Sequence, residues 1–308
     1  MHIMQSKEWG KVRSLYGNQV RSAGGVQYSK HKIPLLNKFY AYAPKVDPLE
    51  INWEELQNSL IENNCINVNL DIPNVVKGTK QEKASEDVLQ MHAIKAPRNT
   101  FTKYNVILDI TPPKEELLDN MHKKHKYNIG YAKRNGVTVK QAETFKDFET
   151  FYDLLVNTSR RQKFYIHNKV FFETIWKNLK PLDIVHILIA YKDKAPIAAW
   201  MLYTYKGVLY YPYGGSDDKY KNLQASTLLG WESILLGKEK NCKTFDMWGV
   251  GNIEEDDSWG KGFTTFKLRY GGKYVEYLDS YDYVINPTLY KVFNITNKIR
   301  WKILRFIK

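Results

Sequence analysis

Residues 183–216 have the sequence "DIVHILIAYKDKAPIAAWMLYTYKGVLYYPYGGS". Three apolar runs rich in β-branched and aromatic residues alternate here with the turn sequences KDKAP and YKG, so we predict three consecutive antiparallel strands. An amphipathic helix at residues 145–164 precedes this stretch, and a helix at 223–241 and a strand at 244–250 follow it. This order of helices and strands predicts a unit of the α/β (α+β) class.

The N-terminal part of the chain shows the same alternation. We predict strands at residues 39–44 and 66–73 with a helix at 53–64 between them. A strand at 104–113 closes with two prolines and is followed by one helix at 114–136. The chain is long enough for two ordinary domains, each with its own core.

The composition narrows the class of partner. The chain has 308 residues, with 46 Lys and Arg against 33 Asp and Glu and a net charge of +13. This charge favours nucleic acid, nucleotide phosphates or an anionic membrane face. Cys65 and Cys242 have no CxxC spacing, so we predict neither a disulfide framework nor a metal site. No apolar run approaches the roughly 18 to 20 residues of a membrane span, and the N-terminus lacks the apolar core of a signal peptide, which favours a cytoplasmic protein.

Residues 121–134, "MHKKHKYNIGYAKR", form the strongest local basic patch. They contain five Lys or Arg and two His without one acidic residue. The stretch is suited to a polyanion, although a solvated face of an amphipathic helix has the same composition.

The stretch "FTTFKLRYGG", residues 263–272, alternates apolar and basic side chains before two glycines. A period of two is typical of a half-buried strand, which places Lys267 and Arg269 on one face and Phe266 on the other. The basic face either points toward an anion or is simply solvated.

Six motifs occur in the order seen in one protein family. This sequence resembles the FemABX-type peptidyltransferases, and the similarity runs over nearly the whole chain. The motifs are "MQSKEWGKV", "NLDIP", "ELLDNMHKKHKYNIGYAKRNGVTV", "YGGSDDKYKNLQASTLLGWESI", "TFDMWGV" and "FKLRYGG". The chain has no heptad run of three heptads, so it resembles the short members that lack a coiled-coil arm.

The resemblance implies a domain organisation and an activity. It implies two tandem N-acetyltransferase-like (GNAT-like) domains, the first at residues 1–142 completed by a C-terminal segment at 283–308, and the second at 143–282. Members of the family transfer an amino acid from aminoacyl-tRNA to an amine on the stem peptide of a peptidoglycan precursor. The expected partners are therefore aminoacyl-tRNA and either UDP-MurNAc-pentapeptide or lipid II. The expected protein is a monomeric enzyme of interpeptide bridge formation. An aminoacyl ester is already activated, so we expect no cofactor.

The resemblance also implies catalytic residues. Asp71, at the end of a predicted strand, matches an acid proposed to engage the acceptor amine, and Asp109 is the competing acid. Lys267 matches a lysine suited to stabilise the oxyanion of ester aminolysis or to neutralise the tRNA 3′ end. Phe266 would contribute main-chain contacts at the same place.

A second group of residues would bind substrate. By residue type alone, a solvated helix face explains Lys11 and Arg13 equally well, and core packing is the commoner use of aromatic residues such as Tyr211 and Tyr213. The basic residues would hold phosphate, and the tyrosines would line the peptide cleft. The family carries a basic residue near His167 and a tyrosine near Phe171, so the phosphate contact is weakened here. The expected substrate-binding residues are Lys11, Arg13, His167, Tyr211, Tyr213 and Arg269.

Other readings stay open. An acyl-CoA-dependent N-acyltransferase would share the fold, but its phosphate-binding loop is rich in glycine, whereas residues 219–226 read "KYKNLQAS". A non-catalytic protein that binds RNA or muropeptide would keep the basic surface. The last residues, 290–308, combine Lys and Arg with apolar residues, which fits a helix docked on the first domain or peripheral contact with the cytoplasmic membrane.

Overall fold

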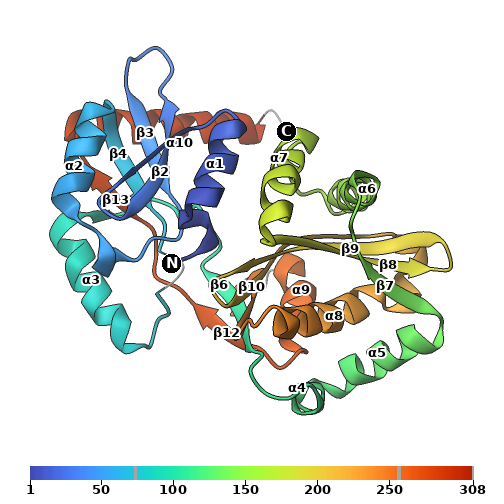
Figure 1. Cartoon of the computed structure of the whole chain (residues 1–308). Coiled ribbons are helices and arrows are strands. Elements are labelled where there is room, and N and C mark those ends of the chain that lie inside the picture. The colour runs from blue at the N-terminus through green and yellow to red at the C-terminus, as the bar shows by residue number, and fades with distance from the viewer. Residues whose placement is uncertain (73–74, 255–257, 307–308) are drawn as a thin grey trace. The chain divides into compact units, whose positions relative to one another are not determined.

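The computed structural model describes residues 1–72, 75–254 and 258–306 (Figure 1). The chain folds into two compact units, one formed by Met1–Lys103 with Tyr277–Lys308 and the other by Tyr104–Glu276. Each unit has a mixed β-sheet with helices packed on it. The predicted α/β class is therefore confirmed.

The first unit is built on a sheet of six strands in the order β1-β2-β3-β4-β13-β5. Neighbouring strands are antiparallel except β3 and β4, which are parallel and are connected through helix α2, Trp53–Glu62. Leu56 and Leu60 of this helix are fully buried in the core of the unit. The strands are β1 (Gln19–Ala23), β2 (Val26–Lys32), β3 (Phe39–Ala43), β4 (Cys65–Leu70), β5 (Ile94–Lys95) and β13 (Tyr281–Val284), and the other helices are α1 (Lys7–Leu15), α3 (Lys80–His92) and α10 (Pro287–Phe306).

A buried carboxylate ties the C-terminal segment to the first sheet. Asp282 in β13 is 4% exposed. One oxygen accepts hydrogen bonds from the side-chain amides of Asn67 and Asn69 in β4. The other accepts a hydrogen bond from the hydroxyl of Tyr290 in α10 at 2.7 Å. Because an unpaired buried carboxylate is costly, these donors anchor β13 and α10 to β4.

The second unit is built on a sheet of seven strands in the order β12-β6-β11-β10-β9-β8-β7. Helices α6 and α7 lie on one face of the sheet, and α5 and α8 lie on the other (Figure 1). The predicted three strands of residues 183–216 are β8, β9 and β10, and they pair in antiparallel hairpins as expected. The strands are β6 (Tyr104–Asp109), β7 (Val137–Gln141), β8 (Val185–Lys192), β9 (Ala195–Tyr205), β10 (Val208–Ser216), β11 (Thr244–Gly249) and β12 (Lys273–Glu276), and the helices are α4 (Lys114–Asn120), α5 (Lys123–Arg134), α6 (Phe145–Gln162), α7 (Lys169–Leu179), α8 (Ala225–Glu239) and α9 (Ser258–Leu268).

One parallel pair of strands opens in the second sheet. β10 and β11 are in register at Val208 with Thr244 and at Tyr210 with Asp246, and the structure gives no pair for the residues that follow. The register of β10 with its antiparallel neighbour β9 shifts between Tyr210 and Tyr213. The register of β11 with its antiparallel neighbour β6 shifts after Asp246. The two strands therefore part after three residue pairs and leave space between them within the sheet.

The boundary between the units differs from the sequence prediction. Residues 104–142 were expected in the first domain, but β6 pairs with β11 and β12, and β7 pairs with β8. The returning C-terminal segment begins at Tyr277 rather than at 283. These pairings join residues that are far apart in sequence, so local periodicity carries no signal for them.

The prediction of a single helix at 114–136 is wrong, because this segment forms two helices. α4 ends at Asn120, and α5 begins at Lys123. Met121 is extended and its side chain is buried in the core, at 3% exposure. The His122 side chain then caps α5 by accepting a hydrogen bond from the backbone N–H of Lys124.

The strand predicted at residues 263–272 is also wrong, because helix α9 extends through Leu268. Phe263, Phe266, Lys267 and Tyr270 are spaced by three, four and seven residues, which is the period of one helix face. The alternation of basic and apolar residues at 266–270 is real but spans too few residues to establish a period of two. Lys267 and Arg269 consequently do not share the face of a strand.

Candidate active site

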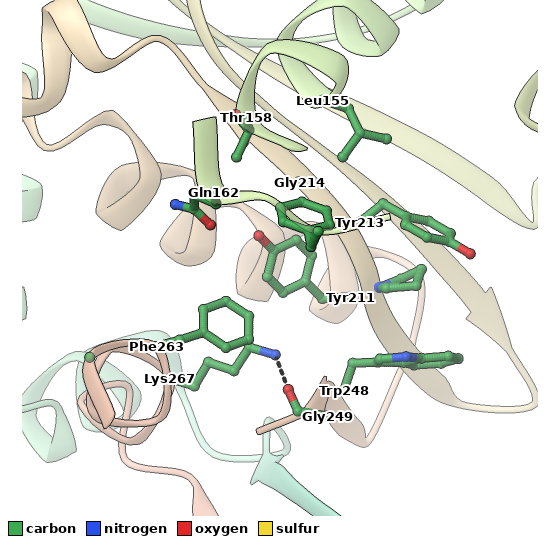
Figure 2. Close-up of a pocket in the computed structure, with 13 residues that line it drawn as sticks. Leu155, Thr158, Gln162, Tyr211, Tyr213, Gly214, Trp248, Gly249, Phe263 and Lys267 are labelled. Atoms are coloured by element: carbon green, nitrogen blue, oxygen red, sulfur yellow. Dashed lines mark hydrogen bonds between the residues drawn. The ribbon is translucent and has the colours of Figure 1, made fainter. Parts of the chain in front are cut away.

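Helix α9 carries Lys267 to the place where β10 and β11 part. The side chain is 1% exposed. Its ammonium donates hydrogen bonds to the backbone oxygens of Met247 and Gly249, the second at 3.0 Å (Figure 2). Both carbonyls come after Asp246, the last residue of β11 that pairs with β10 in the described structure. Since buried carbonyls need donors, the ammonium stabilises the open end of the strand pair.

The ammonium has capacity for one more hydrogen bond. It carries three N–H donors, and two of them bind carbonyls. Nζ lies 4.0 Å from the ring centroid of Phe263 and 5.5 Å from that of Tyr211. The described part of the chain offers no third hydrogen-bond acceptor to Lys267. When the lysine is protonated, the remaining N–H is therefore available to an oxygen atom of a bound molecule.

The pKa of Lys267 lies close to neutral pH. Burial lowers the pKa of Lys267 to about 7, and the carboxylate of Asp246 opposes this shift. Asp246 itself is 6% exposed and accepts hydrogen bonds from the Asn105 side chain and the Trp248 backbone, both at 2.8 Å. A lysine with this pKa gains or loses its charge near neutral pH.

The backbone next to Lys267 is strained. Trp248 has φ of +67°, in the left-handed region that a bulky residue adopts at a cost of about 1–2 kcal/mol. The hydrogen bond from its N–H to Asp246 holds this conformation. Strained residues of this kind gather at functional sites because the surrounding structure holds them in place.

Two glycines allow α9 to approach the chain that follows β11. A Cβ on either Gly251 or Gly260 would lie 2.7 Å from the Cα of the other, which is closer than real Cβ atoms come. The hydroxyl of Thr264 in α9 also accepts a hydrogen bond from the N–H of Gly251. This close contact fixes the position of the helix and thereby that of Lys267.

A cavity of about 700 Å³ opens beside Lys267. This volume lies in the range of small-molecule sites. Figure 2 shows Lys267 and Phe263 on one side, with Tyr211 and residues of α6 on the other. The lining residues are Leu155, Thr158, Gln162, Phe164, Tyr211, Pro212, Tyr213, Gly214, Trp248, Gly249, Gly262, Phe263 and Lys267.

Tyr211 and Tyr213 both line this cavity, although their rings have different neighbours. The Tyr211 ring stacks on Trp200 at 3.7 Å between centroids, and the Tyr213 ring meets Phe172 edge-on at 4.9 Å. The irregularity of β10 between Tyr210 and Tyr213 breaks the regular alternation of its side chains. Both tyrosines thus serve the packing of the unit and the wall of the cavity.

Phe266 is positioned by a histidine that the sequence did not single out. His125 in α5 is 1% exposed, and its Nε2 lies 2.9 Å from the backbone oxygen of Phe266. A donor is required at that nitrogen, so the neutral ring carries its proton on Nε2. Nδ1 is buried without a hydrogen-bond partner in the described structure. Burial lowers the pKa of His125 to about 4, which keeps the ring neutral at physiological pH.

Asp71 and Asp109 have different surroundings. Asp71 is 2% exposed at the end of β4 in the first unit, where it accepts hydrogen bonds from Ser280 at 2.7 Å and Tyr42 at 3.3 Å. Burial raises the pKa of Asp71 above its usual value, and these donors oppose the rise. Asp109 is exposed and accepts two hydrogen bonds from Thr111, which lower its pKa.

The remaining predicted residues lie on the surface or near it. Lys11 and Arg13 are in α1 of the first unit, exposed and half-buried respectively. His167 is exposed before α7, and its ring contacts that of Phe171 at 3.9 Å. Arg269 follows α9, and its backbone oxygen accepts a hydrogen bond from the N–H of His122. Of all the predicted residues, the structure brings together Lys267, Tyr211 and Tyr213 in one cavity.

Several residues of the site were not predicted. The sequence signal for Phe263 is its spacing of four residues from Lys267, which makes the two side chains neighbours on a helix. Trp248 and Gly249 belong to the motif "TFDMWGV", but nothing in that motif indicates a left-handed tryptophan. Thr158 and Gln162 lie one turn apart on α6, on a helix that was predicted for its apolar face alone.

This chain is similar to known proteins in sequence and in fold. A model of the FemAB family matches residues 89–193 and 180–298. The lipid II:glycine glycyltransferase of Staphylococcus haemolyticus (strain JCSC1435) is 31% identical over 83 residues, which are 27% of this chain and 20% of that protein. Aminoacyltransferase FemA of Staphylococcus epidermidis is 24% identical over 93 residues, which are 30% of this chain and 22% of that protein. The matched segments thus span about a fifth of these curated relatives.

Solved structures show the same fold. The crystal structure of FemX has a TM-score of 0.80 over 94% of each chain at 17% sequence identity. The C-terminal domain (DUF2156) of a putative lysylphosphatidylglycerol synthetase from Agrobacterium fabrum has a TM-score of 0.56 at 10% identity, over 92% of this chain and 89% of that one.

The pKa of Lys267 predicts a pH-dependent stability. Between pH 7 and about 10.5 the native lysine has lost its proton and the unfolded one retains it, so the free energy of unfolding rises with pH. The contribution of one such group is at most about 1.4 kcal/mol per pH unit. Urea unfolding of the parent and of Lys267→Met from pH 6 to pH 9.5 measures the difference. We expect the parent to gain stability relative to the variant above pH 7, and parallel curves would contradict the lowered pKa.

Proposed function

Because the chain belongs to the FemAB family, we propose that it is an aminoacyltransferase that acts on the stem peptide of a peptidoglycan precursor. The amino acid comes from aminoacyl-tRNA, and the product is the peptide bond that starts or extends an interpeptide bridge. The names of the relatives, lipid II:glycine glycyltransferase and aminoacyltransferase FemA, support this class of reaction. The reaction needs no cofactor, since the ester bond is already activated.

The observation that carries the proposal is the available N–H of Lys267 at the cavity wall. A neutral amine attacks the ester carbonyl, and a C–N bond forms as negative charge develops on the carbonyl oxygen. The C–O bond to the tRNA ribose then breaks, and the ribose oxygen takes the proton that the amine has lost and becomes a free hydroxyl. In its protonated form, which is populated up to about pH 7, Lys267 is a cation next to the developing oxyanion and lowers the barrier by several kcal/mol.

The acceptor amine needs to be neutral before it attacks. A lysine-like amine has a pKa near 10.4, so at neutral pH only about one molecule in a few thousand is neutral. We assign Asp71 to orient this amine or accept its proton. Its raised pKa suits a general base. Ser280 and Tyr42 hold the carboxylate in place.

The other predicted substrate contacts form part of the same proposal. In the first unit, Lys11 and Arg13 would bind phosphate of the precursor. In the second unit, His167 is a separate candidate for a phosphate contact, and Tyr211 and Tyr213 would contact the peptide. Phe266 would act through its backbone, whose oxygen already accepts a hydrogen bond from His125 Nε2. Arg269 would bind phosphate of the tRNA.

Transfer assays test the role of Lys267. The parent enzyme is mixed with aminoacyl-tRNA and, in separate reactions, UDP-MurNAc-pentapeptide or lipid II, and the product is identified by mass. Lys267→Met removes the cation and keeps most of the stem, so single-turnover transfer should fall by roughly a hundredfold or more. Binding of the precursor should change little, because the lost interaction forms in the transition state.

Arg269→Met is the matched control for this experiment. It also removes one cation, but we expect weaker tRNA binding with a salt dependence reduced by about one phosphate contact and nearly normal transfer at saturating tRNA. A Lys267→Met variant that melts normally and transfers at the parent rate would exclude the mechanism. Robust transfer from acetyl-CoA in place of aminoacyl-tRNA would instead indicate an acyl-CoA-dependent enzyme.

Asp71→Asn tests the proposed base. The substitution keeps the shape and removes the charge, so turnover should fall by roughly a hundredfold while precursor binding is retained. Ser280→Ala removes one hydrogen bond to the same carboxylate and controls for local stability. If Asp71→Asn lowers the melting temperature but transfers at the parent rate, Asp71 is a structural residue.

We further propose that α10 contacts the cytoplasmic face of the membrane, where a lipid-linked precursor resides. Val292, Ile295 and Ile299 lie on one side of the helix and are 52%, 60% and 53% exposed. Lys291 and Lys298 are exposed beside them. Apolar side chains flanked by lysines are typical of helices that lie in the plane of an anionic surface. None of the helices in the described ranges is long and apolar enough to cross a membrane.

Vesicle sedimentation tests this contact. The parent should bind phosphatidylglycerol vesicles more tightly than phosphatidylcholine vesicles because of the lysines. Ile295→Ser with Ile299→Ser should weaken binding about tenfold or more, since two buried apolar side chains are lost. Ile61→Ser in α2 removes an isoleucine of similar exposure and should have no effect. Equal binding of the double variant and the parent would contradict membrane contact through α10.

A further inference from the structure

The outward side of α5 carries only basic and aromatic side chains. Its inward side chains, His125, Asn128, Ile129 and Ala132, are buried. Positions three and four apart share one face of a helix. The residues on the side opposite the buried ones therefore form a continuous outward face. We call this the α5 outer face, and its members are Lys123, Lys124, Tyr127, Tyr131 and Arg134.

The cations of the α5 outer face have no acidic partners. Lys126 and Lys133, on the flank of the helix, form ion pairs with Asp119 and Glu232. Among the described residues, Lys123, Lys124 and Arg134 form no ion pair. Their charges are consequently available to an anion from outside the chain.

The aromatic residues of the α5 outer face are arranged with a cation. Tyr127 is 62% exposed, its ring stacks with Tyr131 at 6.0 Å between centroids, and the guanidinium of Arg134 lies 5.9 Å from its ring. A Cβ at Gly130 would lie 3.0 Å from Nη1 of Arg134. The glycine therefore gives the arginine room to extend along the helix to Tyr127.

This combination fits RNA better than a membrane or an apolar partner. The exposed ring of Tyr127 offers a flat surface on which a base stacks, and cations without acidic partners beside it bind the phosphates that connect the bases. A membrane-binding face would need aliphatic or larger apolar side chains, and the α5 outer face has none. The overall charge of +13 favours the same kind of partner.

The buried side of α5 connects the outer face to the candidate active site. His125 Nε2 donates to the backbone oxygen of Phe266, the residue before Lys267. The N–H of His122 donates to the backbone oxygen of Arg269, which places this arginine next to the start of α5. The outer face is thus about one helix diameter, roughly 10–12 Å, from the helix that carries Lys267.

We propose that the α5 outer face binds the RNA of the aminoacyl-tRNA donor, with Arg269 extending it toward α9. The inference rests on the proposed function, and it names the surface that holds the body of the donor while the ester lies near Lys267. Lys123, Lys124 and Arg134 bind phosphates, and Tyr127 stacks on a base or a ribose.

Binding of uncharged tRNA across a salt series tests this surface directly. Lys123→Gln with Arg134→Gln removes two phosphate contacts, so the slope of log K against log salt should fall by about 1.4 to 1.8. Tyr127→Ala should weaken binding about fivefold or more with an unchanged slope. Lys126→Gln with Lys133→Gln changes the same net charge on the same helix through paired lysines, and it should have a much smaller effect. Melting curves confirm that each variant is folded.

A second assay separates this inference from the proposed function. Transfer is measured from full-length aminoacyl-tRNA and from an aminoacyl-dinucleotide that has the same ester but lacks the RNA body. The outer-face variants should lose at least tenfold in kcat/KM with the tRNA and retain the parent rate with the dinucleotide.

Each result of these assays has one meaning. If a folded Lys123→Gln/Arg134→Gln variant keeps the parent affinity, slope and kcat/KM for tRNA, the α5 outer face does not bind the donor. If neither substrate yields product with the parent protein, the proposed function is wrong, and the tRNA-binding series still decides whether α5 binds RNA.

Discussion

The ammonium of Lys267, bound to the carbonyls of Met247 and Gly249, is the interaction on which the second unit depends at its centre. β10 and β11 part after three residue pairs, and a sheet opened in this way needs donors for its freed backbone. A protonated lysine supplies them and still keeps one N–H for a ligand. Structural support and the proposed catalytic role therefore come from one side chain.

Other features of the unit can be understood as support for this lysine. The left-handed Trp248 and the close pair Gly251 and Gly260 bring the chain after β11 against α9. His125 binds the carbonyl of Phe266, near the other end of α9 from Gly260. The helix is thus held near both of its ends, which gives the rigidity that the proposed oxyanion site requires.

The sequence predicted best the elements whose apolar pattern extends over many neighbouring residues. The strands of residues 183–216 and the helix from Phe145 were predictable, because apolar periodicity reports which face of a segment is buried. The six ordered motifs indicated the family that the matched model supports. For residues 263–272 the alternation was too short, and the helical spacing of Phe263, Lys267 and Tyr270 was the correct signal.

The sequence by itself determined the α/β class, most strands and helices, and Lys267 as a candidate residue. The tertiary structure decided that Lys267 lies in a helix, that residues 104–142 belong to the second unit, and that His125 contacts Phe266 across 141 positions of the chain. The reason is physical. Local patterns reflect burial and backbone preference within one element, whereas strand pairing and the contacts of a buried ammonium are selected by the packing of distant elements against one another.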